Sequence, residues 1–250
     1  MIDTEQWSET LLEKLQAHFG DHLVFAGIQG SRARGEARDE SDIDFVAIFE
    51  TLDASTIRQY REIVATMEQS DLACGFVGSR SALAAWPHHE LIQFVNDTKA
   101  LHGSLLDIVE APTKSEARQA AAIGAAGLYH AACHLCAFDS MQNPDQNYDA
   151  TKALFKNAVF TMQAHCFAQG SNYPHSRAEL EHILERQGWN EEADILRIGC
   201  DEEALRAHSV DTLCDMIISW SERIMATYTE SPRRSSSAKN AKPTASRLKS

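Results

Sequence analysis

Short apolar runs and longer stretches of helical periodicity alternate along the first hundred residues. The apolar runs at 23–28 and 45–49 are rich in β-forming residues and predict two strands. Residues 4–19 and 53–69 carry apolar side chains at intervals of three and four, which predicts a helix in each. A further apolar run at 71–77 predicts a third strand after the second helix.

The end of this region predicts two short helices and a closing strand. Residues 79–86 are expected to form the first helix, and Pro87 opens the second. A last strand is expected within residues 94–103. His102 lies in that strand, and we interpret it as a structural residue.

Beyond residue 113 the apolar spacing is helical throughout, and no stretch predicts a strand. Alanine is abundant in residues 114–138, which favours helix and close packing. Further helices are expected over residues 149–169, 176–187 and 190–199 and in a last segment that begins at Cys200. This pattern predicts an antiparallel bundle of four or five helices.

The predicted fold class is therefore α+β, with a short mixed sheet in the N-terminal part and an antiparallel helical bundle in the C-terminal part. The expected domains are residues 1–110 and residues 111–230. Residues 231–250 are rich in Ser, Lys, Arg, Ala and Pro, cannot bury a core, and are predicted to form a disordered basic tail.

The loop between the first two strands carries the strongest chemical signal. It begins with Gly30-Ser31, and a glycine there can turn backbone N–H groups toward an anion. Ten residues later comes Asp42-Ile43-Asp44, and a strand period of two places both carboxylates on one face. Two like charges side by side raise a carboxylate pKa unless a cation lies between them. The pattern therefore predicts a Mg²⁺ site beside a phosphate cradle.

This combination resembles the DNA polymerase β-like nucleotidyltransferase superfamily. The resemblance rests on Gly30-Ser31, the ten-residue spacer and Asp42-Ile43-Asp44, and it covers roughly residues 20–105. The fuller pattern, Gly-Ser-x-Ala-x-Gly-x-x-x-x-x-Ser-Asp-Ile-Asp, is similar to the small bacterial branch, which includes aminoglycoside nucleotidyltransferases and the minimal nucleotidyltransferases. A polar hairpin loop with a solvated acidic strand is the alternative interpretation.

The resemblance implies an enzyme that transfers a nucleoside monophosphate from a nucleoside triphosphate, with ATP as first candidate, and releases pyrophosphate. Residues 1–110 would be the catalytic domain, and residues 111–230 would bind the acceptor. One or two Mg²⁺ ions would be held by Asp42 and Asp44. The expected phosphate contacts come from Gly30, Ser31 and Ser41 and from one of the arginines, with Arg34 ranked before Arg32 and Arg38.

Asp71 stands where the superfamily carries a third carboxylate. The resemblance implies that it acts as a general base, or assists metal binding, at the attacking hydroxyl. Because Asp71 follows Ser70 at the start of the predicted strand, a residue of the helix-exit turn is the alternative.

The acceptor is left open between a small molecule such as an aminoglycoside and a protein hydroxyl, as in antitoxin-like enzymes. A nucleotide-binding sensor or scaffold without transfer activity is a third possibility. The length of the helical part favours the small molecule. The pattern carries no signal for the oligomeric state or for the preferred base of the nucleotide.

The net charge of the chain restricts the classes of molecule that it is expected to bind. The chain has a formal net charge of −13, and its last twenty residues hold six positive charges and no acid. Removing these charges leaves −19 for residues 1–230, which argues against nucleic acid and suits a cationic substrate. A charge that only keeps the protein soluble is the equally weighted alternative. The acidic N-terminus lacks the pattern of a signal peptide, and no apolar run reaches the length of a membrane span, so we expect a cytoplasmic protein without a membrane partner.

The cysteines bear on redox chemistry and metals. Six cysteines scattered through apolar segments predict reduced thiols rather than a disulfide framework. His130, Cys133, His134 and Cys136 are spaced for one helix face, but a single helix rarely supplies four tetrahedral zinc ligands. Core packing is the preferred interpretation of this cluster.

Overall fold

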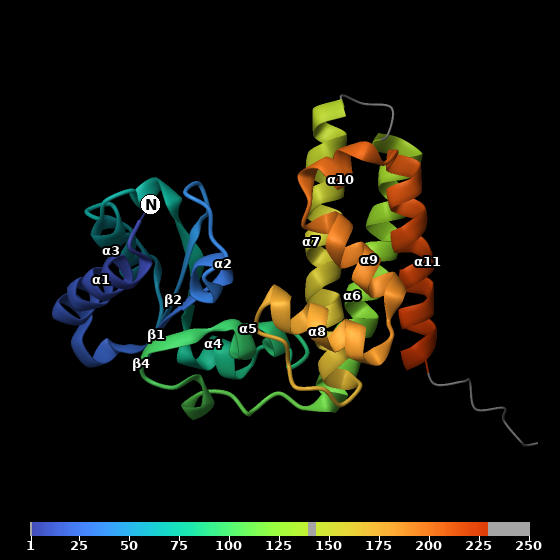
Figure 1. The fold of residues 1–250 in the computed structure, drawn as a ribbon. Coiled ribbons are helices and arrows are strands. Elements are labelled where there is room, and N and C mark those ends of the chain that lie inside the picture. The colour runs from blue at the N-terminus through green and yellow to red at the C-terminus, as the bar shows by residue number, and fades with distance from the viewer. Residues whose placement is uncertain (1, 140–143, 230–250) are drawn as a thin grey trace, which may run out of the picture.

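The N-terminal half is built on a four-stranded mixed sheet, as the sequence predicts. The computed structural model describes residues 2–139 and 144–229. The strands lie in the order β3-β2-β1-β4, where β1 is antiparallel to β2 and β4, and β2 is parallel to β3 (Figure 1). Their bounds are Leu23–Gln29 for β1, Ile43–Phe49 for β2, Ala73–Ser79 for β3 and Lys99–His102 for β4.

Helices cover both faces of this sheet. Helices α1 (Thr4–Phe19) and α3 (Ala54–Val64) lie on one face, and α4 (Arg80–Ala84) and α5 (Leu91–Asp97) lie on the other. Alternate residues of β2 enter the two cores, because Phe45 packs with α1 while Val46 packs with α4 and α5. The sheet is thus buried on both sides, and its functional groups are left for the strand ends.

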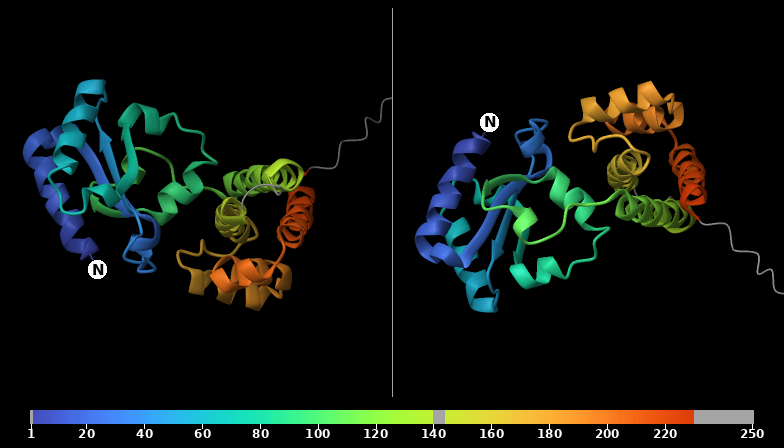
Figure 2. Two further views of the ribbon diagram at one scale, coloured as in Figure 1. Left: turned by 90° about the horizontal axis from the view of Figure 1, so that it is seen from above. Right: turned by 90° about the horizontal axis from the view of Figure 1, so that it is seen from below.

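The C-terminal half is helical and has its own core. Three long helices, α6 (Lys114–His134), α7 (Pro144–Ala168) and α11 (Val210–Tyr228), pack together, and Figure 2 shows them nearly end-on. The shorter α8 (Arg177–Gln187), α9 (Asn190–Gly199) and α10 (Glu202–Ala207) stack against one side of them. The indole of Trp220 is fully buried in this core and donates to Glu192 at 3.1 Å.

Among the described residues, one helical segment, Lys114–Phe138, is long and apolar enough to cross a membrane, with a mean hydropathy of 1.3 over an 18-residue window. Its apolar character comes largely from alanine, and its buried face, which includes Ala117, Ala121 and Ala125, packs into the bundle core. Small side chains allow α7 and α11 to approach this helix closely. Within the described residues, the buried part of this segment thus belongs to the bundle core, while most of its residues are not buried.

Several boundaries differ from the sequence prediction. The loop after β1 first forms a short helix, α2 (Gly30–Arg34), and a 3₁₀ turn, Ser70–Leu72, precedes β3. Helix α7 begins at Pro144 rather than at residue 149, because proline fits the first turn of a helix, where its missing N–H costs no hydrogen bond. The predicted disordered tail lies outside the described residues.

The cysteines lie in both halves of the chain, with Cys74 in β3 and the other five in the helical half. All six cysteines are free thiols. Within residues 2–139 and 144–229, no group of three or more His, Cys, Asp or Glu side chains is placed to hold a metal ion. Core packing stays the interpretation of His130, Cys133, His134 and Cys136. Burial raises the pKa of Cys214, whose thiol hydrogen-bonds with Cys136, so this pair packs as thiols.

Candidate active site

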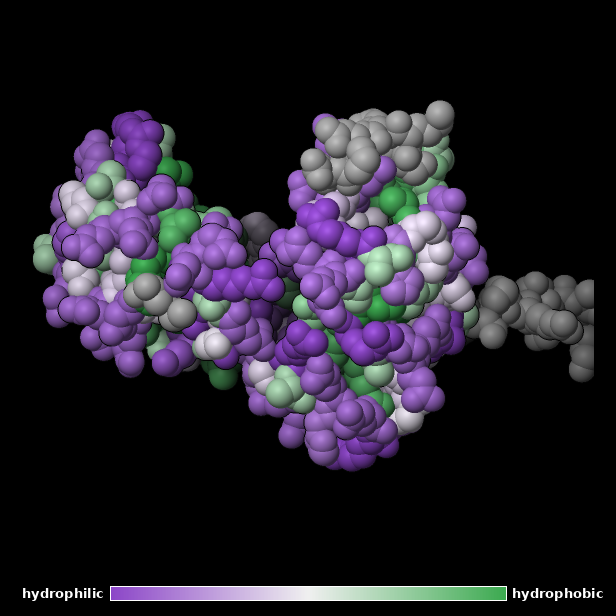
Figure 3. Space-filling model, turned by 45° about the horizontal axis from the view of Figure 1, so that its top comes forward, coloured by the Kyte–Doolittle hydropathy of each residue, from purple (hydrophilic) through white to green (hydrophobic). Residues whose placement is uncertain are grey.

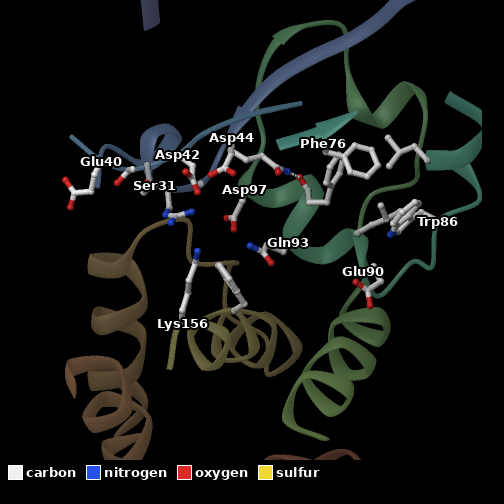
Figure 4. Close-up of a pocket in the computed structure, with 18 residues that line it drawn as sticks. Ser31, Glu40, Asp42, Asp44, Phe76, Trp86, Glu90, Gln93, Asp97 and Lys156 are labelled. Carbon is white, nitrogen blue, oxygen red and sulfur yellow. Dashed lines mark hydrogen bonds between the residues drawn. The ribbon is translucent and has the colours of Figure 1, made fainter. Parts of the chain in front are cut away.

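A cavity of about 540 Å³ opens between the two halves (Figures 3 and 4). It lies at the edge of the sheet where β1 ends and β2 begins, since Gln29 and Asp44 are paired in the register of these strands. The structure brings six of the residues that the sequence singles out to its wall: Gly30, Ser31, Arg34, Ser41, Asp42 and Asp44.

The two carboxylates of the Asp-x-Asp pattern line this cavity together. Asp42 is exposed just before β2, and Asp44 is partly buried within it. Burial raises the pKa of Asp44, and the neighbouring Asp42 raises it further, while Lys156 and Arg34 act in the opposite direction. The pair is therefore a concentration of negative charge with two cationic side chains facing it.

Gly30 lies directly against Asp44. Its φ is +71°, and a Cβ built on it would lie 2.1 Å from Oδ2 of Asp44. Any other residue at this position would both adopt a strained backbone and displace the carboxylate. The glycine of the Gly-Ser pair is thus required by the close approach of the chain to the acidic pair.

The loop between α2 and β2 is held from inside by Arg32. This side chain is buried, with 7 % of its surface exposed, and does not line the cavity. Its guanidinium donates to the backbone carbonyl of Ser41 at 2.6 Å and to that of Asp42 at 3.1 Å. Arg32 therefore positions the residues that precede Asp44 and has no free edge for a phosphate.

Replacing Arg32 by methionine keeps much of the buried alkyl volume but leaves these carbonyls without a donor. We expect the free energy of unfolding to fall by about 1.5–3 kcal/mol, the range for hydrogen bonds to a charged group. Urea denaturation measures this change. Arg38→Met is the matched control, because Arg38 is exposed, and a change of less than about 0.5 kcal/mol is expected there. Equal losses in the two variants would contradict the structural role of Arg32.

The other two arginines of the loop, Arg34 and Arg38, differ in whether they face the cavity. Arg34 lines the cavity, and its Nε is 2.8 Å from Oε2 of Glu36. Glu36 also accepts from the backbone N–H of Arg177 at 2.8 Å, which ties this loop to the start of α8. Arg38 is exposed and lies outside the cavity wall. Arg34 is thus the arginine of the three that faces the acidic pair.

Asp71 is not brought together with these residues. It is exposed in the 3₁₀ turn Ser70–Leu72 and does not line the cavity. The residue of β3 that is paired with Asp44 is Cys74, and the residue of β3 on the cavity wall is Phe76. The neighbouring strand therefore contributes no carboxylate to this cavity.

Other parts of the chain supply functional groups that the motif does not reveal. Lys156 of α7 and Asp97 of α5 line the same cavity, and Figure 4 shows both side chains reaching into it. The sequence offers one sign of Lys156: it is a basic residue four positions before Phe160 on a largely apolar predicted helix. The sign of Asp97 is weaker: it is an acidic residue that follows Asn96 at the end of a short apolar segment. Neither signal indicates which cavity the side chain faces.

The opposite end of the cavity is aromatic. The rings of Phe76 and Trp86 meet edge to face with centroids 5.6 Å apart, and Phe94 packs on Phe76 in the same way at 5.1 Å. Trp86 keeps 39 % of its surface exposed, which is high for so large an apolar side chain. The cavity therefore has a charged end at the sheet and an apolar, open end at α4 and α5.

The acidic pair fits a Mg²⁺ ion that is completed by a ligand. Two carboxylates on one face of a strand are hard oxygen donors, and within residues 2–139 and 144–229 no cluster of three metal-binding side chains stands beside them. Mg²⁺ is usually held by one or two carboxylates together with substrate phosphates, rather than by a cage of protein ligands alone. The donor set therefore suits a metal that binds with a polyphosphate.

Comparison with solved structures places this fold. No family model and no curated protein matches the chain. Spectinomycin adenyltransferase AAD(9) from Enterococcus faecialis, solved with ATP and spectinomycin, is similar with a TM-score of 0.51 at 13 % identity. The match covers 88 % of this chain and 100 % of that one. The chain therefore shares the overall fold of that enzyme, a mixed sheet followed by a helical region. Both halves take part in the likeness, since the aligned share extends well beyond the sheet.

Proposed function

We propose that this protein transfers a nucleoside monophosphate from a nucleoside triphosphate, first of all ATP, to a hydroxyl of a small acceptor molecule, with release of pyrophosphate. One observation carries the proposal. Asp42 and Asp44 face Arg34 and Lys156 across one end of a cavity that two halves of the chain enclose. Opposed acidic and basic groups of this kind suit a metal-bound polyphosphate.

Each side chain has a separate task in this proposal. Asp42 and Asp44 would hold Mg²⁺, which when bound supplies positive charge beside the reacting phosphate. Arg34 would bind phosphate oxygens with its planar guanidinium, whose position Glu36 fixes. Lys156 would neutralise the polyphosphate from the helical half. Gly30 lets the chain, with the Ser31 hydroxyl beside it, come close to the acidic pair.

The aromatic end of the cavity supports a small ring-containing acceptor. Trp86 offers an open indole face, and Glu90 lines the same region with a carboxylate that is 57 % exposed. An indole face attracts ammonium groups as well as apolar ring faces. Together with the net negative charge, this favours a cationic aminoglycoside or a related amino-substituted ring compound.

A labelling panel tests the proposal. The full chain with Mg²⁺ is offered α-³²P-labelled ATP, GTP, CTP and UTP, each with a set of aminoglycosides that includes spectinomycin, and separately with cell lysate. Label on a small molecule supports the proposed reaction. Label on a protein band would replace it with protein nucleotidylation. Nucleotide binding without any transfer would indicate a sensor.

Lys156→Gln is expected to weaken nucleotide binding about tenfold, because a charged contact to phosphate worth about 1.4 kcal/mol is lost. Calorimetric titration with MgATP measures the dissociation constant. Lys152→Gln is the matched control: Lys152 lies one turn away on α7, outside the cavity, with its ammonium 5.8 Å from the centre of the Tyr148 ring. An equal effect of both substitutions would show that only the overall charge matters.

A further inference from the structure

We propose that Asp97 is the carboxylate that takes the proton from the acceptor hydroxyl. This inference rests on the proposed transfer reaction and adds to it the identity of the general base. A general base must lie within hydrogen-bond reach of the hydroxyl that it deprotonates, so it has to stand inside the cavity near the acidic pair. Figure 4 shows the side chain of Asp97 directed into the cavity below Asp44.

An unused oxygen is the first observation. Asp97 has 8 % of its surface exposed, and its Oδ2 accepts a hydrogen bond from the Tyr173 hydroxyl at 3.3 Å. Its Oδ1 is buried and has no hydrogen-bond partner among the described residues. A buried carboxylate oxygen without a donor is costly and rare in folded proteins. Asp97 itself lines the cavity, so a small turn of its carboxylate would bring this oxygen to a hydroxyl that arrives with the acceptor.

Fixed placement is the second observation. The C-terminal end of α5 is tied to β1, since Nε2 of Gln29 donates to the carbonyl of Phe94 at 3.2 Å. The segment that carries Tyr173 is tied to the helical half, since Gln163 donates to the carbonyl of Pro174 at 2.9 Å. Both halves of the molecule therefore position Asp97, as a base that must meet two substrates requires.

The electrostatic surroundings suit a base near neutral pH. Burial raises the pKa of Asp97 to about 6, while Arg34, Tyr173, His175 and Gln93 act to lower it. These groups face it from α2, from the segment after α7 and from α5 itself. Above this pKa the carboxylate is ionised and can accept a proton, and below it the proton already occupies the site.

As the acceptor oxygen forms its bond to the α-phosphorus, its proton passes to the carboxylate of Asp97. The bond between the α-phosphorus and the bridging oxygen breaks, and pyrophosphate leaves with that electron pair. Asp97 then releases the proton to water after the products depart.

Two other carboxylates are weaker candidates for this proton transfer. Asp71 is exposed and lies outside the cavity wall. Glu90 lines the cavity, but its side chain is 57 % exposed and its Oε1 is 3.4 Å from Nε2 of His89. Asp97 alone among these three combines burial, the cavity wall and an unpaired oxygen.

Asp97→Asn tests the inference in the full chain, with the nucleotide and acceptor that acquire label in the panel above. We expect kcat to fall by about 10²–10³-fold, the range for a general base. The dissociation constant for MgATP and the acceptor KM should change by less than about threefold, and the melting temperature should not fall, because a neutral amide is easier to bury than a charge.

The pH profile is the second measurement. Wild-type kcat/KM should rise with pH through about 6 and then level off, and Asp97→Asn should lose this rise. Tyr173→Phe removes a hydrogen bond that lowers the pKa of Asp97, so its rise should move to higher pH. That shift is a readout a merely structural tyrosine would not give.

Three results would overturn the inference: an unchanged kcat in Asp97→Asn with only a raised acceptor KM, a wild-type profile flat down to pH 5, or a loss of kcat in Asp71→Asn but not in Asp97→Asn. Failure of the proposed function itself looks different, because the wild-type protein would then transfer no label to any acceptor.

Discussion

Replacing Asp44 by asparagine is expected to lower transfer about 10³-fold while the protein stays folded. Asparagine keeps the size of the side chain but removes the charge that would hold Mg²⁺ beside the reacting phosphate, and loss of such electrostatic stabilisation typically costs this much. Initial rates of label transfer at saturating MgATP measure the effect. Asp42→Asn should behave in the same way, since both carboxylates line the cavity.

The Asp44→Asn substitution should not lower the stability of the protein, although it lowers activity. Burial and Asp42 raise the pKa of Asp44 in the folded protein above its usual 3.8, so the ionised group disfavours folding at neutral pH. The penalty is present at pH values above the folded-state pKa and is relieved as the pH falls through it. Asp44→Asn is therefore expected to melt at the same temperature as wild type or slightly higher at pH 7.

The control for these substitutions is Asp21→Asn. Asp21 is exposed in the turn that leads into β1, at the opposite end of that strand from the cavity. Full activity is expected there. If Asp44→Asn transferred label at the wild-type rate with Mg²⁺ present, the assignment of the metal pair would be wrong.

Gly30→Ala is the second substitution with a large expected effect. The new Cβ would meet Oδ2 of Asp44 at 2.1 Å and would stand at a φ of +71°. The carboxylate must then move by about an ångström, and misplacement on this scale costs about 10²-fold in rate. The backbone strain adds about 1–2 kcal/mol of destabilisation. Single-turnover rates and urea denaturation separate these two effects.

Gly35→Ala separates strain from displacement. Gly35 has the same φ of +71°, but nothing lies within 4 Å of the Cβ it would gain. We expect a similar loss of stability with activity within about twofold of wild type. Equal losses of activity in Gly30→Ala and Gly35→Ala would show that the loop backbone, rather than the position of Asp44, limits the reaction.

Local sequence signals predicted much of the fold for clear physical reasons. Apolar runs of six and five residues located β1 and β2, and the ten-residue spacer between Gly30-Ser31 and Asp42 placed both ends of the loop at one edge of the sheet. Strand periodicity placed Asp42 and Asp44 on one wall. Helix signals such as Ser176 and Gly188 likewise located α8 from Arg177 to Gln187, because both residues act as caps.

Features that depend on tertiary packing were beyond these signals. Three arginines in one loop look alike in sequence, and only the fold shows that Arg32 turns inward while Arg34 faces the cavity. Lys156 and Asp97 are remote from the motif in sequence and join it through the packing of α7 and α5. The position of Asp71 depended on whether β3 began before or after it, a difference of two residues.

The most direct test of the central claim measures both products of a single reaction. Wild-type protein, Mg²⁺, ATP and the labelled acceptor should yield one pyrophosphate for each acceptor molecule that gains one adenylyl group, as followed by mass spectrometry. The Asp42→Asn/Asp44→Asn variant should yield neither product while keeping its fold. Release of phosphate instead of pyrophosphate, or undiminished product in the double variant, would contradict nucleotidyl transfer at this cavity.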